Sequence, residues 1–281
     1  MFRCIYCGGQ SYNEYRIINT YPLNICLRCG LLTTEINERI RKKYIHKEYS
    51  KQYIDNYVQV LPKMYVRYEK YLKLIEQYYR GGKLLDVGCG TGYFLKYVKD
   101  RNNNWKVFGI EPSSLLRSVA QKNTKITIKT GTLRRIPYGD NYFNVITCFD
   151  VLEHSKDLNE NLYEIRRVLK PGGLLLVQAP NYESFMANIT GDKWDWWCIP
   201  DHILHFSYTF LCKILISQDF TILAKYTYEN KEDFLSNIKA KFSGTPLTKT
   251  LYYLLIPVFI FIEKAVPIIN RGGLSVVLVR K

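Results

Sequence analysis

From residue 83 onward, continuous apolar runs alternate with amphipathic stretches. The apolar runs predict strands at Lys83–Val87, Trp105–Ile110, Lys125–Lys129, Phe143–Phe149 and Leu174–Gln178. Apolar positions at helical spacing predict helices between them, at Gly92–Lys99, Ser113–Lys122 and Leu158–Leu169. Strands that are apolar on both faces and alternate with helices are typical of a parallel sheet covered on both sides. The pattern therefore predicts an α/β fold with a doubly wound, mostly parallel sheet and helices on both faces.

The residues before 81 and after 180 do not show this regular alternation of strands and helices. Beyond Pro180 we predict a helix near Tyr208–Gln218, a strand at Thr221–Tyr226, an apolar helix around Leu247–Ile269 and a last strand at Leu274–Val279. Before residue 81, residues 1–33 are turn-rich, whereas residues 34–80 are rich in tyrosine and charge, with helical spacing. We expect three parts: a module over 1–33, a helical connector or cap over 34–80, and a main domain over 81–281 with a lid near 181–210.

The N-terminal module contains two C-x-x-C pairs, separated by eighteen residues. The pairs are Cys4 with Cys7 and Cys26 with Cys29. Two-residue spacing lets both sulfurs of a pair reach one ion across a tight turn, and two such turns complete a four-thiolate Zn²⁺ site. The alternative is two unrelated or redox-active thiol pairs. A closed four-thiolate site has no open position for a substrate, so we expect a structural zinc ribbon.

A glycine-rich turn follows the first predicted strand of the main domain. Gly88, Gly90 and Gly92 stand at alternate positions between that strand and the next helix, and Asp86 precedes them. Glycines allow a tight turn and the close approach of a ligand, and the new helix offers free N–H groups. The spacing differs from the dinucleotide G-x-G-x-x-G pattern. A carboxylate just before the turn suits a ligand with a positively charged end.

Acidic residues also follow two other predicted strands. Glu111 ends the second strand, 19 residues past Gly92, where a carboxylate can accept both hydroxyls of a ribose. Asp150 follows the strand Phe143–Phe149, just before Glu153 and His154. Together with the glycine turn, these positions indicate a site for an adenosine-containing ligand.

In this order and spacing, the segments LLDVGCGTGYFL, GIEPS, DVLEHSKDLNENLYEIRRVLKPGGLLLV and APN resemble the class I S-adenosylmethionine (SAM)-dependent methyltransferases. The resemblance covers residues 81–180 closely and implies a seven-stranded Rossmann-like sheet with SAM as the cofactor. It implies that Asp86 lies near the methionine moiety and that Glu111 binds the ribose. The other cofactor-binding residues that it implies are Gly88, Cys89, Gly90, Gly92, Thr132, Leu133, Phe149 and Asp150. The family often has an acidic residue near 132–133, which this chain lacks.

The N-terminal cysteine module and the segment WDWWCIPDHILHFSYTFL together resemble bacterial and archaeal methyltransferases of sugar and cell-surface glycan pathways. This resemblance implies methylation of oxygen or carbon on a small-molecule, nucleotide-sugar or lipid-linked glycan acceptor. Whether the methylated atom is oxygen or carbon, the acceptor must lose a proton. Candidate residues for that step are His154, His202, His205 and Tyr182.

Composition adds limits and alternatives. The chain has 281 residues, of which 40 are basic and 25 acidic, giving a net charge of +15. That charge favours polyanionic partners, so RNA methylation through a basic ribbon is a second hypothesis. A third is a zinc-ribbon interaction protein without activity. The chain opens without an apolar signal segment, which predicts a cytoplasmic protein. We expect it to be a monomer or a homodimer. The apolar stretch 247–269 could pack within the protein or at a dimer interface. Because basic residues flank it, it could also lie on the inner face of the membrane.

Overall fold

The computed structural model describes residues 3–37, 39–41, 51–229, 234–235, 238–239 and 246–281. Residues 42–50 of the predicted helical connector lie outside this range. Most of the connector residues within it form one long helix, α2 (Lys51–Glu76), which ends shortly before the glycine pair Gly81–Gly82, and residues 39–41 are also helical.

The main domain is built on one seven-stranded sheet in the order β10-β11-β8-β7-β4-β5-β6. Its strands are β4 (Gly82–Val87), β5 (Trp105–Ile110), β6 (Ile128–Lys129), β7 (Phe143–Phe149), β8 (Leu169–Pro180), β10 (Thr221–Tyr228) and β11 (Leu274–Arg280). The five strands from β8 to β6 are parallel to one another, and β11 runs antiparallel to both of its neighbours. The chain first builds the sheet outward from β4 to β6 and then returns to add β7 and β8 on the other side of β4.

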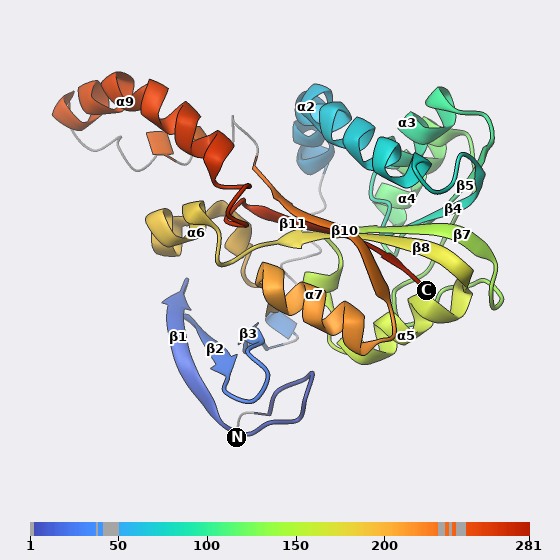
Figure 1. The fold of residues 1–281 in the computed structure, drawn as a ribbon, viewed down its shortest axis with the longest axis horizontal. Helices are drawn as coiled ribbons and strands as arrows, with labels where there is room; N and C mark the ends of the chain where they lie inside the picture. The colour runs from blue at the N-terminus through green and yellow to red at the C-terminus, as the bar shows by residue number, and fades with distance from the viewer. Residues whose placement is uncertain (1–2, 38, 42–50, 230–233, 236–237, 240–245) are drawn as a thin grey trace.

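Helices cover both faces of this sheet (Figure 1). On one face lie α2, α3 (Tyr93–Arg101) and α4 (Ser114–Thr124), and on the other lie α5 (Leu158–Val168) and α7 (Tyr208–Ser217). Two apolar clusters fill the two interfaces, because the strand residues are apolar on both sides. The predicted fold class is confirmed.

One predicted strand is much shorter in the structure. Residues 125–129 read as a strand, but β6 comprises Ile128–Lys129 alone. The helix α4 runs on to Thr124, and Lys125 then adopts a left-handed conformation with φ of 57° that ends the helix. The apolar run therefore divides between a helix cap and the edge of the sheet.

A second, four-stranded sheet joins the N-terminal module to a distant segment of the chain. Its order is β1 (Tyr12–Ile18), β2 (Tyr21–Cys26), β3 (Leu32–Thr34) and β9 (Leu204–His205). All of its strand pairs are antiparallel, and β3 faces β9 through Leu32 with His205 and Thr33 with Leu204. The predicted lid region thus contributes a strand to the cysteine module.

The segment after β8 forms α6 (Phe185–Thr190) and the short 3-10 helices η2 (Gly191–Lys193) and η3 (Asp195–Trp197). It packs through a third apolar cluster against one side of α9 (Pro246–Ala265), which extends beyond the edge of the main sheet (Figure 1). Among the residues that the structure describes, no helix has the length and apolar content needed to cross a bilayer.

Candidate functional site

A cavity of about 1150 Å³ opens at the carboxyl ends of β4, β5 and β7. In open parallel sheets, ligands bind where the strand order reverses, and here the reversal lies between β4 and β7. Of the ten residues predicted to bind the cofactor, nine line this cavity: Asp86, Gly88, Cys89, Gly90, Glu111, Thr132, Leu133, Phe149 and Asp150. The tenth, Gly92, does not.

The glycine turn has backbone conformations that favour glycine. Gly88 has a φ of +67°, and a side chain there would meet Val151 at 2.7 Å. Gly90 has a φ of +52°, and a side chain there would meet no protein atom within 4 Å, because the residue faces the cavity. Gly92 instead lets α3 approach Ala120 of α4 closely. Two glycines therefore shape the cavity, and the third serves packing.

Glu111 is a buried carboxylate held by backbone donors. Its Oε2 accepts a hydrogen bond from the Gly90 N–H at 3.0 Å, and its Oε1 accepts one from the Ser113 N–H at 2.8 Å. Burial raises the pKa of Glu111, although these two hydrogen bonds oppose the shift. The arrangement fixes both oxygens at the cavity wall and ties the glycine turn to the end of β5.

Asp86 lies at the end of β4 with its side chain in the same cavity. Its Oδ1 accepts a hydrogen bond from the Thr147 hydroxyl at 2.7 Å. Burial, together with the nearby charge of Glu111, raises the pKa of Asp86 to about 7. A cation bound beside Asp86 would favour its charged form, so the group is matched to a positively charged ligand.

A chain of polar side chains closes the cavity beyond β7. The side-chain Nε2 of Gln178 donates hydrogen bonds of 2.7 Å to both carboxylate oxygens of Asp150, and the Tyr71 hydroxyl donates to the side-chain Oε1 of Gln178. Asp150 holds a left-handed backbone conformation with φ of 53°, and burial raises its pKa. The side chain of Asp150 is thus fixed by Gln178 of β8, which in turn contacts Tyr71 of α2.

The four predicted catalytic residues do not lie together. His154 lines the cavity, and its Nδ1 lies 3.2 Å from both the Asp201 carbonyl and a carboxylate oxygen of Asp201. Burial lowers the pKa of His154, but the hydrogen bond and charge of Asp201, aided by Glu153, outweigh this effect and raise it to about 9. His202 lies behind His154, with 4.8 Å between the ring centroids, and burial lowers its pKa well below the usual range.

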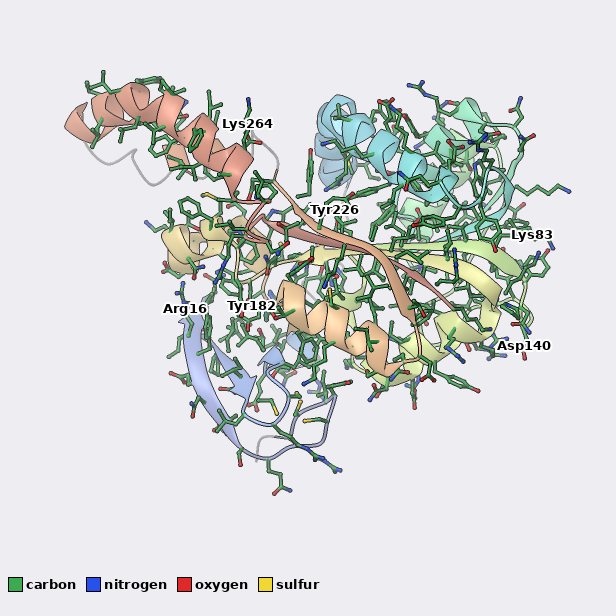
Figure 2. All side chains as sticks on the ribbon, viewed as in Figure 1. Arg16, Lys83, Asp140, Tyr182, Tyr226 and Lys264 are labelled. Carbon is green, nitrogen blue, oxygen red and sulfur yellow. The ribbon has the colours of Figure 1, made fainter. Side chains whose placement is uncertain are left out.

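His205 and Tyr182 belong to the junction with the cysteine module instead. His205 is buried, its Nε2 lies 2.7 Å from the Thr34 hydroxyl, and burial lowers its pKa to about 3. Tyr182, labelled in Figure 2, belongs to the segment after β8. Its ring packs edge-on against that of Tyr15 of β1, and the two ring centroids are 5.6 Å apart. Neither of these two residues, both within the described range, lines the cavity.

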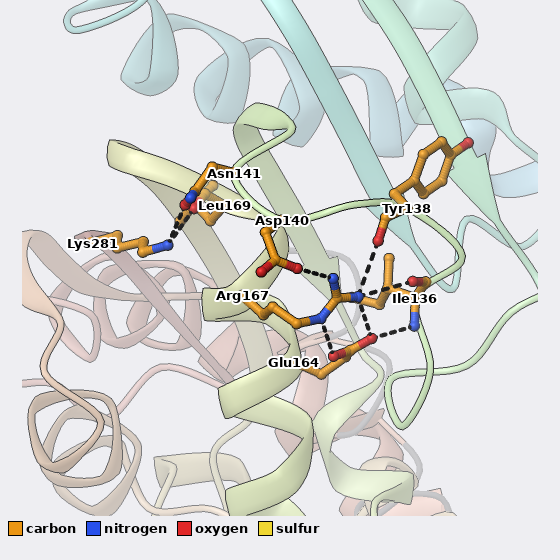
Figure 3. A network of polar contacts seen from close by, with 8 residues as sticks. All are labelled: Ile136, Tyr138, Asp140, Asn141, Glu164, Arg167, Leu169 and Lys281. Carbon is orange, nitrogen blue, oxygen red and sulfur yellow. Dashed lines mark hydrogen bonds and ion pairs between the residues drawn. The ribbon is translucent and has the colours of Figure 1, made fainter.

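An ionic network holds the loop that carries Thr132 and Leu133. Arg167 of α5 pairs with Glu164 at 2.7 Å and with Asp140 at 2.5 Å (Figure 3). Its guanidinium also donates to the carbonyls of Ile136 and Tyr138 at 3.3 and 3.0 Å. The loop between β6 and β7 is therefore anchored to α5 just after the residues that line the cavity.

The four N-terminal cysteines gather at one point. Their sulfurs all lie within 4.8 Å of one another, with 3.6 Å between Cys4 and Cys29 and between Cys7 and Cys26. Zn–S bonds of about 2.3 Å in a tetrahedral site put sulfurs about 3.8 Å apart, so these side chains fit a Zn²⁺ ion. Each pair is followed by a glycine with positive φ, at Gly8 and Gly30, as the symmetric turns require.

Several cavity residues were not singled out in the sequence. They are Arg41, Met64, Arg67, Tyr68, Tyr71, Gln178 and Asp201. Four of these lie on α2, where their helical spacing indicates packing equally well. Gln178 could have been singled out from the sequence, because it is the one polar residue in the buried run from Leu174 to Pro180.

Comparison with known proteins identifies the family. A family profile described as "Methyltransferase domain" matches residues 63–225, more than half of the chain. A "probable S-adenosylmethionine-dependent methyltransferase" of Mycolicibacterium smegmatis is 32% identical over 106 residues, which cover 37% of this chain and 40% of that protein. The chain thus spans about two fifths of the length of the curated relatives that it matches first.

Solved structures share the fold. A SAM-dependent methyltransferase from Archaeoglobus fulgidus has a TM-score of 0.56 at 14% identity, covering 78% of this chain and 94% of that one. Coclaurine N-methyltransferase, solved with N-methylheliamine and S-adenosylhomocysteine (SAH), has a TM-score of 0.53 at 17% identity, covering 77% and 72%. With the profile match and the site at the strand ends, these findings show that the chain belongs to the methyltransferase family and has the class I SAM-dependent fold.

Proposed function

We propose that this protein transfers a methyl group from SAM to an oxygen or carbon of a glycan or related small-molecule acceptor. The observation that carries the proposal is the meeting of Asp86, the Gly88–Gly90 turn and Glu111 in one cavity at the topological switch of the sheet. Glu111 would accept the ribose hydroxyls and Asp86 would face the cationic methionine end. Thr132 and Leu133 would flank the adenine.

SAM carries its own activation, since its methyl group sits on a sulfonium. Transfer breaks the S–CH₃ bond, leaves its electrons on sulfur and forms an O–CH₃ or C–CH₃ bond, while the acceptor gives up a proton. The protein must align the two molecules and exclude water. Ligand pockets measure about 300–1,000 Å³, so a cavity of about 1150 Å³ has room for donor and acceptor together.

The acceptor would sit at the α2 end of the cavity. Asp150 and His154 line that end, as do the basic side chains Arg41, Arg67 and Lys156. Guanidinium and ammonium groups bind phosphate well, which supports a nucleotide-sugar or a lipid-linked glycan as the acceptor. Among the four predicted catalytic residues His154 alone lines the cavity, and a general-base role for any of them stays a prediction.

The cysteine module would hold a structural Zn²⁺ through Cys4, Cys7, Cys26 and Cys29. Four thiolates complete its coordination, so the ion would take no part in methyl transfer. Thiolates of this kind persist in the reducing cytoplasm, which is where we place the enzyme.

The outer face of α9 supports contact with a membrane. Leu251, Leu254, Val258 and Phe261 form one exposed stripe at spacings of three and four residues, and Phe261 is 74% exposed. The opposite side of α9 packs into the third apolar cluster, so the helix is apolar all round. With Lys264 beyond the stripe, this surface suits an anionic lipid face and hence a lipid-linked acceptor.

Calorimetry with SAM and SAH tests the proposed activity. We expect binding of both, a loss of about tenfold or more in affinity for Glu111→Gln, and no comparable binding of NAD or ATP. The reason is that an amide at position 111 places an NH₂ against the N–H of Gly90 or Ser113 and leaves a buried donor unpaired, at a cost of about 1–3 kcal/mol.

Incubation with methyl-labelled SAM and candidate acceptors then identifies the class of acceptor. Label in glycan or nucleotide-sugar fractions supports the proposal. Label in RNA would favour the second hypothesis, and a protein that binds neither SAM nor SAH would favour the non-catalytic one.

A further inference from the structure

Behind the acceptor end of the cavity, three metal-binding side chains converge outside the cysteine module. Glu153 and His154 belong to the 3-10 helix η1 (Leu152–His154), and His202 comes from the loop before β9. One ligand atom from each of the three lies within 4.8 Å of the others. Glu153 Oε1 is 4.0 Å from His202 Nε2.

Glu153 is a buried carboxyl group whose oxygens form no hydrogen bond with the described residues. The residue is 1% exposed. A buried ionised carboxylate without partners is costly, and such groups are normally paired or bound to a metal. Burial and the charge of Asp150 raise the pKa of Glu153 to about 8, so the group is largely neutral without a cation. A cation bound to the two unpartnered oxygens would favour the charged form.

Both histidines use Nδ1 for a hydrogen bond within the protein, which leaves Nε2 as the ring nitrogen that could bind an ion. The Nδ1 of His202 lies 3.0 Å from the Trp196 carbonyl, and that of His154 lies 3.2 Å from the Asp201 carbonyl. A carbonyl oxygen only accepts, so each Nδ1 carries a proton. Nε2 of His202 then keeps its lone pair, because burial lowers the pKa of that ring, whereas an ion binding Nε2 of His154 would displace the proton that Asp201 and Glu153 favour there. Metal-binding histidines typically donate their second ring N–H to a carbonyl or carboxylate in this way.

We propose that Glu153, His154 and His202 bind a divalent transition-metal ion directly behind the acceptor end of the cavity, which His154 lines. Two imidazoles and one carboxylate form a ligand set suited to ions of the Fe²⁺ and Zn²⁺ type. Bonds of about 2.0–2.2 Å require ligand atoms about 3–3.5 Å apart. The three side chains thus need to close by roughly an ångström around the ion.

The ion has a defined relation to the proposed reaction, and this step rests on the proposed function. Three protein ligands leave positions open, and His154 lines the cavity that would hold the acceptor. An acceptor hydroxyl bound there through its oxygen would lose its proton to solvent more readily, because the metal stabilises the alkoxide. The oxygen would then attack the methyl group. The inference therefore favours a hydroxyl acceptor over a carbon acid.

Titration of the zinc-loaded protein with Co²⁺ tests the site, with calorimetry for stoichiometry and absorption spectra for the ligand type. We expect one Co²⁺ per chain without thiolate charge-transfer bands, in addition to the zinc already held. Glu153→Gln and His202→Gln should each weaken Co²⁺ binding about 100-fold. Glu160→Gln, which changes an exposed acidic residue of α5, is the matched control and should leave it unchanged.

SAH binding by the same variants separates the two proposals. Neither Glu153 nor His202 lines the cavity, so SAH affinity should stay within about twofold of the wild type. Retained SAH binding with no cobalt beyond the cysteine site would overturn the metal site and leave the methyltransferase standing. Cobalt binding without SAH binding would support the metal site and overturn the proposed methyltransferase activity. Equal cobalt affinity in Glu153→Gln and His202→Gln, with unchanged thermal unfolding, would also overturn the site.

Discussion

Asp86 should make the affinity for SAM depend on pH near neutrality. In the empty cavity its pKa is about 7, because burial and the Glu111 charge disfavour the carboxylate while the Thr147 hydroxyl only partly offsets them. A cationic ligand beside Asp86 requires the charged form, so at lower pH binding must first expel a proton. Affinity should therefore fall as the pH drops below 7.

The size of this effect follows from the pKa. With a pKa of about 7, the charged fraction of Asp86 falls from about 90% at pH 8 to about 10% at pH 6. The dissociation constant for SAM should thus rise about tenfold over this range, provided that bound SAM holds the pKa near the ordinary value of about 3.9. Below pH 6, each further drop of one pH unit should raise the dissociation constant for SAM by up to about another tenfold.

Calorimetric titration at pH 6, 7 and 8 provides the assay. Asp86→Asn should bind more weakly at pH 8 and lose most of the pH dependence, since the amide can still accept from Thr147 but does not titrate. Asp100→Asn on the exposed side of α3 is the matched control and should behave as the wild type. The raised pKa of Glu111 accounts for any small slope that remains. A full tenfold change that persists in Asp86→Asn would refute the reasoning.

Four further changes test other parts of the structure. Cys26→Ser should release the zinc and lower the unfolding temperature by several degrees, as metal analysis and calorimetry would show. Gly88→Ala should weaken SAM binding about tenfold, because a methyl group at positive φ would meet Val151 at 2.7 Å. Arg167→Ala should weaken it several-fold by freeing the loop that carries Thr132 and Leu133, again by calorimetry. Phe261→Ser should reduce flotation with anionic vesicles about tenfold, since a buried Phe side chain contributes about 1.5–3 kcal/mol.

Matched variants keep these results interpretable. Cys198→Ser changes an exposed cysteine outside the cluster and should retain the zinc. Tyr163→Ser changes a similarly exposed aromatic residue on α5 and should leave vesicle binding unchanged. Flotation that ignores lipid charge, or that Phe261→Ser leaves intact, would count against the membrane surface. A protein that self-associates through α9 would show the loss as a change of oligomeric state instead.

The main sheet could be predicted because its strands are continuous apolar runs. The expected bounds of β5 and β7 match the structure residue for residue, since most residues of each run are buried. The strand β6 was overestimated, because an apolar run alone does not reveal that Lys125 ends a helix. Periodicity thus located elements whose burial is uniform and failed where one residue changes the backbone course.

The candidate site divides in a similar way. Residues that directly follow strands, such as Glu111 and Asp150, could be placed together because parallel strands end at one edge. The Gln178–Tyr71 contact joins residues 107 positions apart, and no local pattern reveals it. The same holds for His205, whose partner Thr34 lies 171 positions away. Long-range pairing is set by tertiary packing, which a single sequence does not display.

The strand pairing between β3 and β9 has a consequence for how this protein is assembled. The strand β9, which pairs with β3 of the cysteine module, lies some 170 positions later in the chain. During synthesis the four-stranded sheet therefore cannot form completely until most of the main domain has left the ribosome. The sheet of the module is therefore complete only when the segment Leu204–His205 is present. If the cysteine cluster binds Zn²⁺ as proposed, losing the ion would disturb β3 and, through the strand pairing, Leu204 and His205, which closely follow His202.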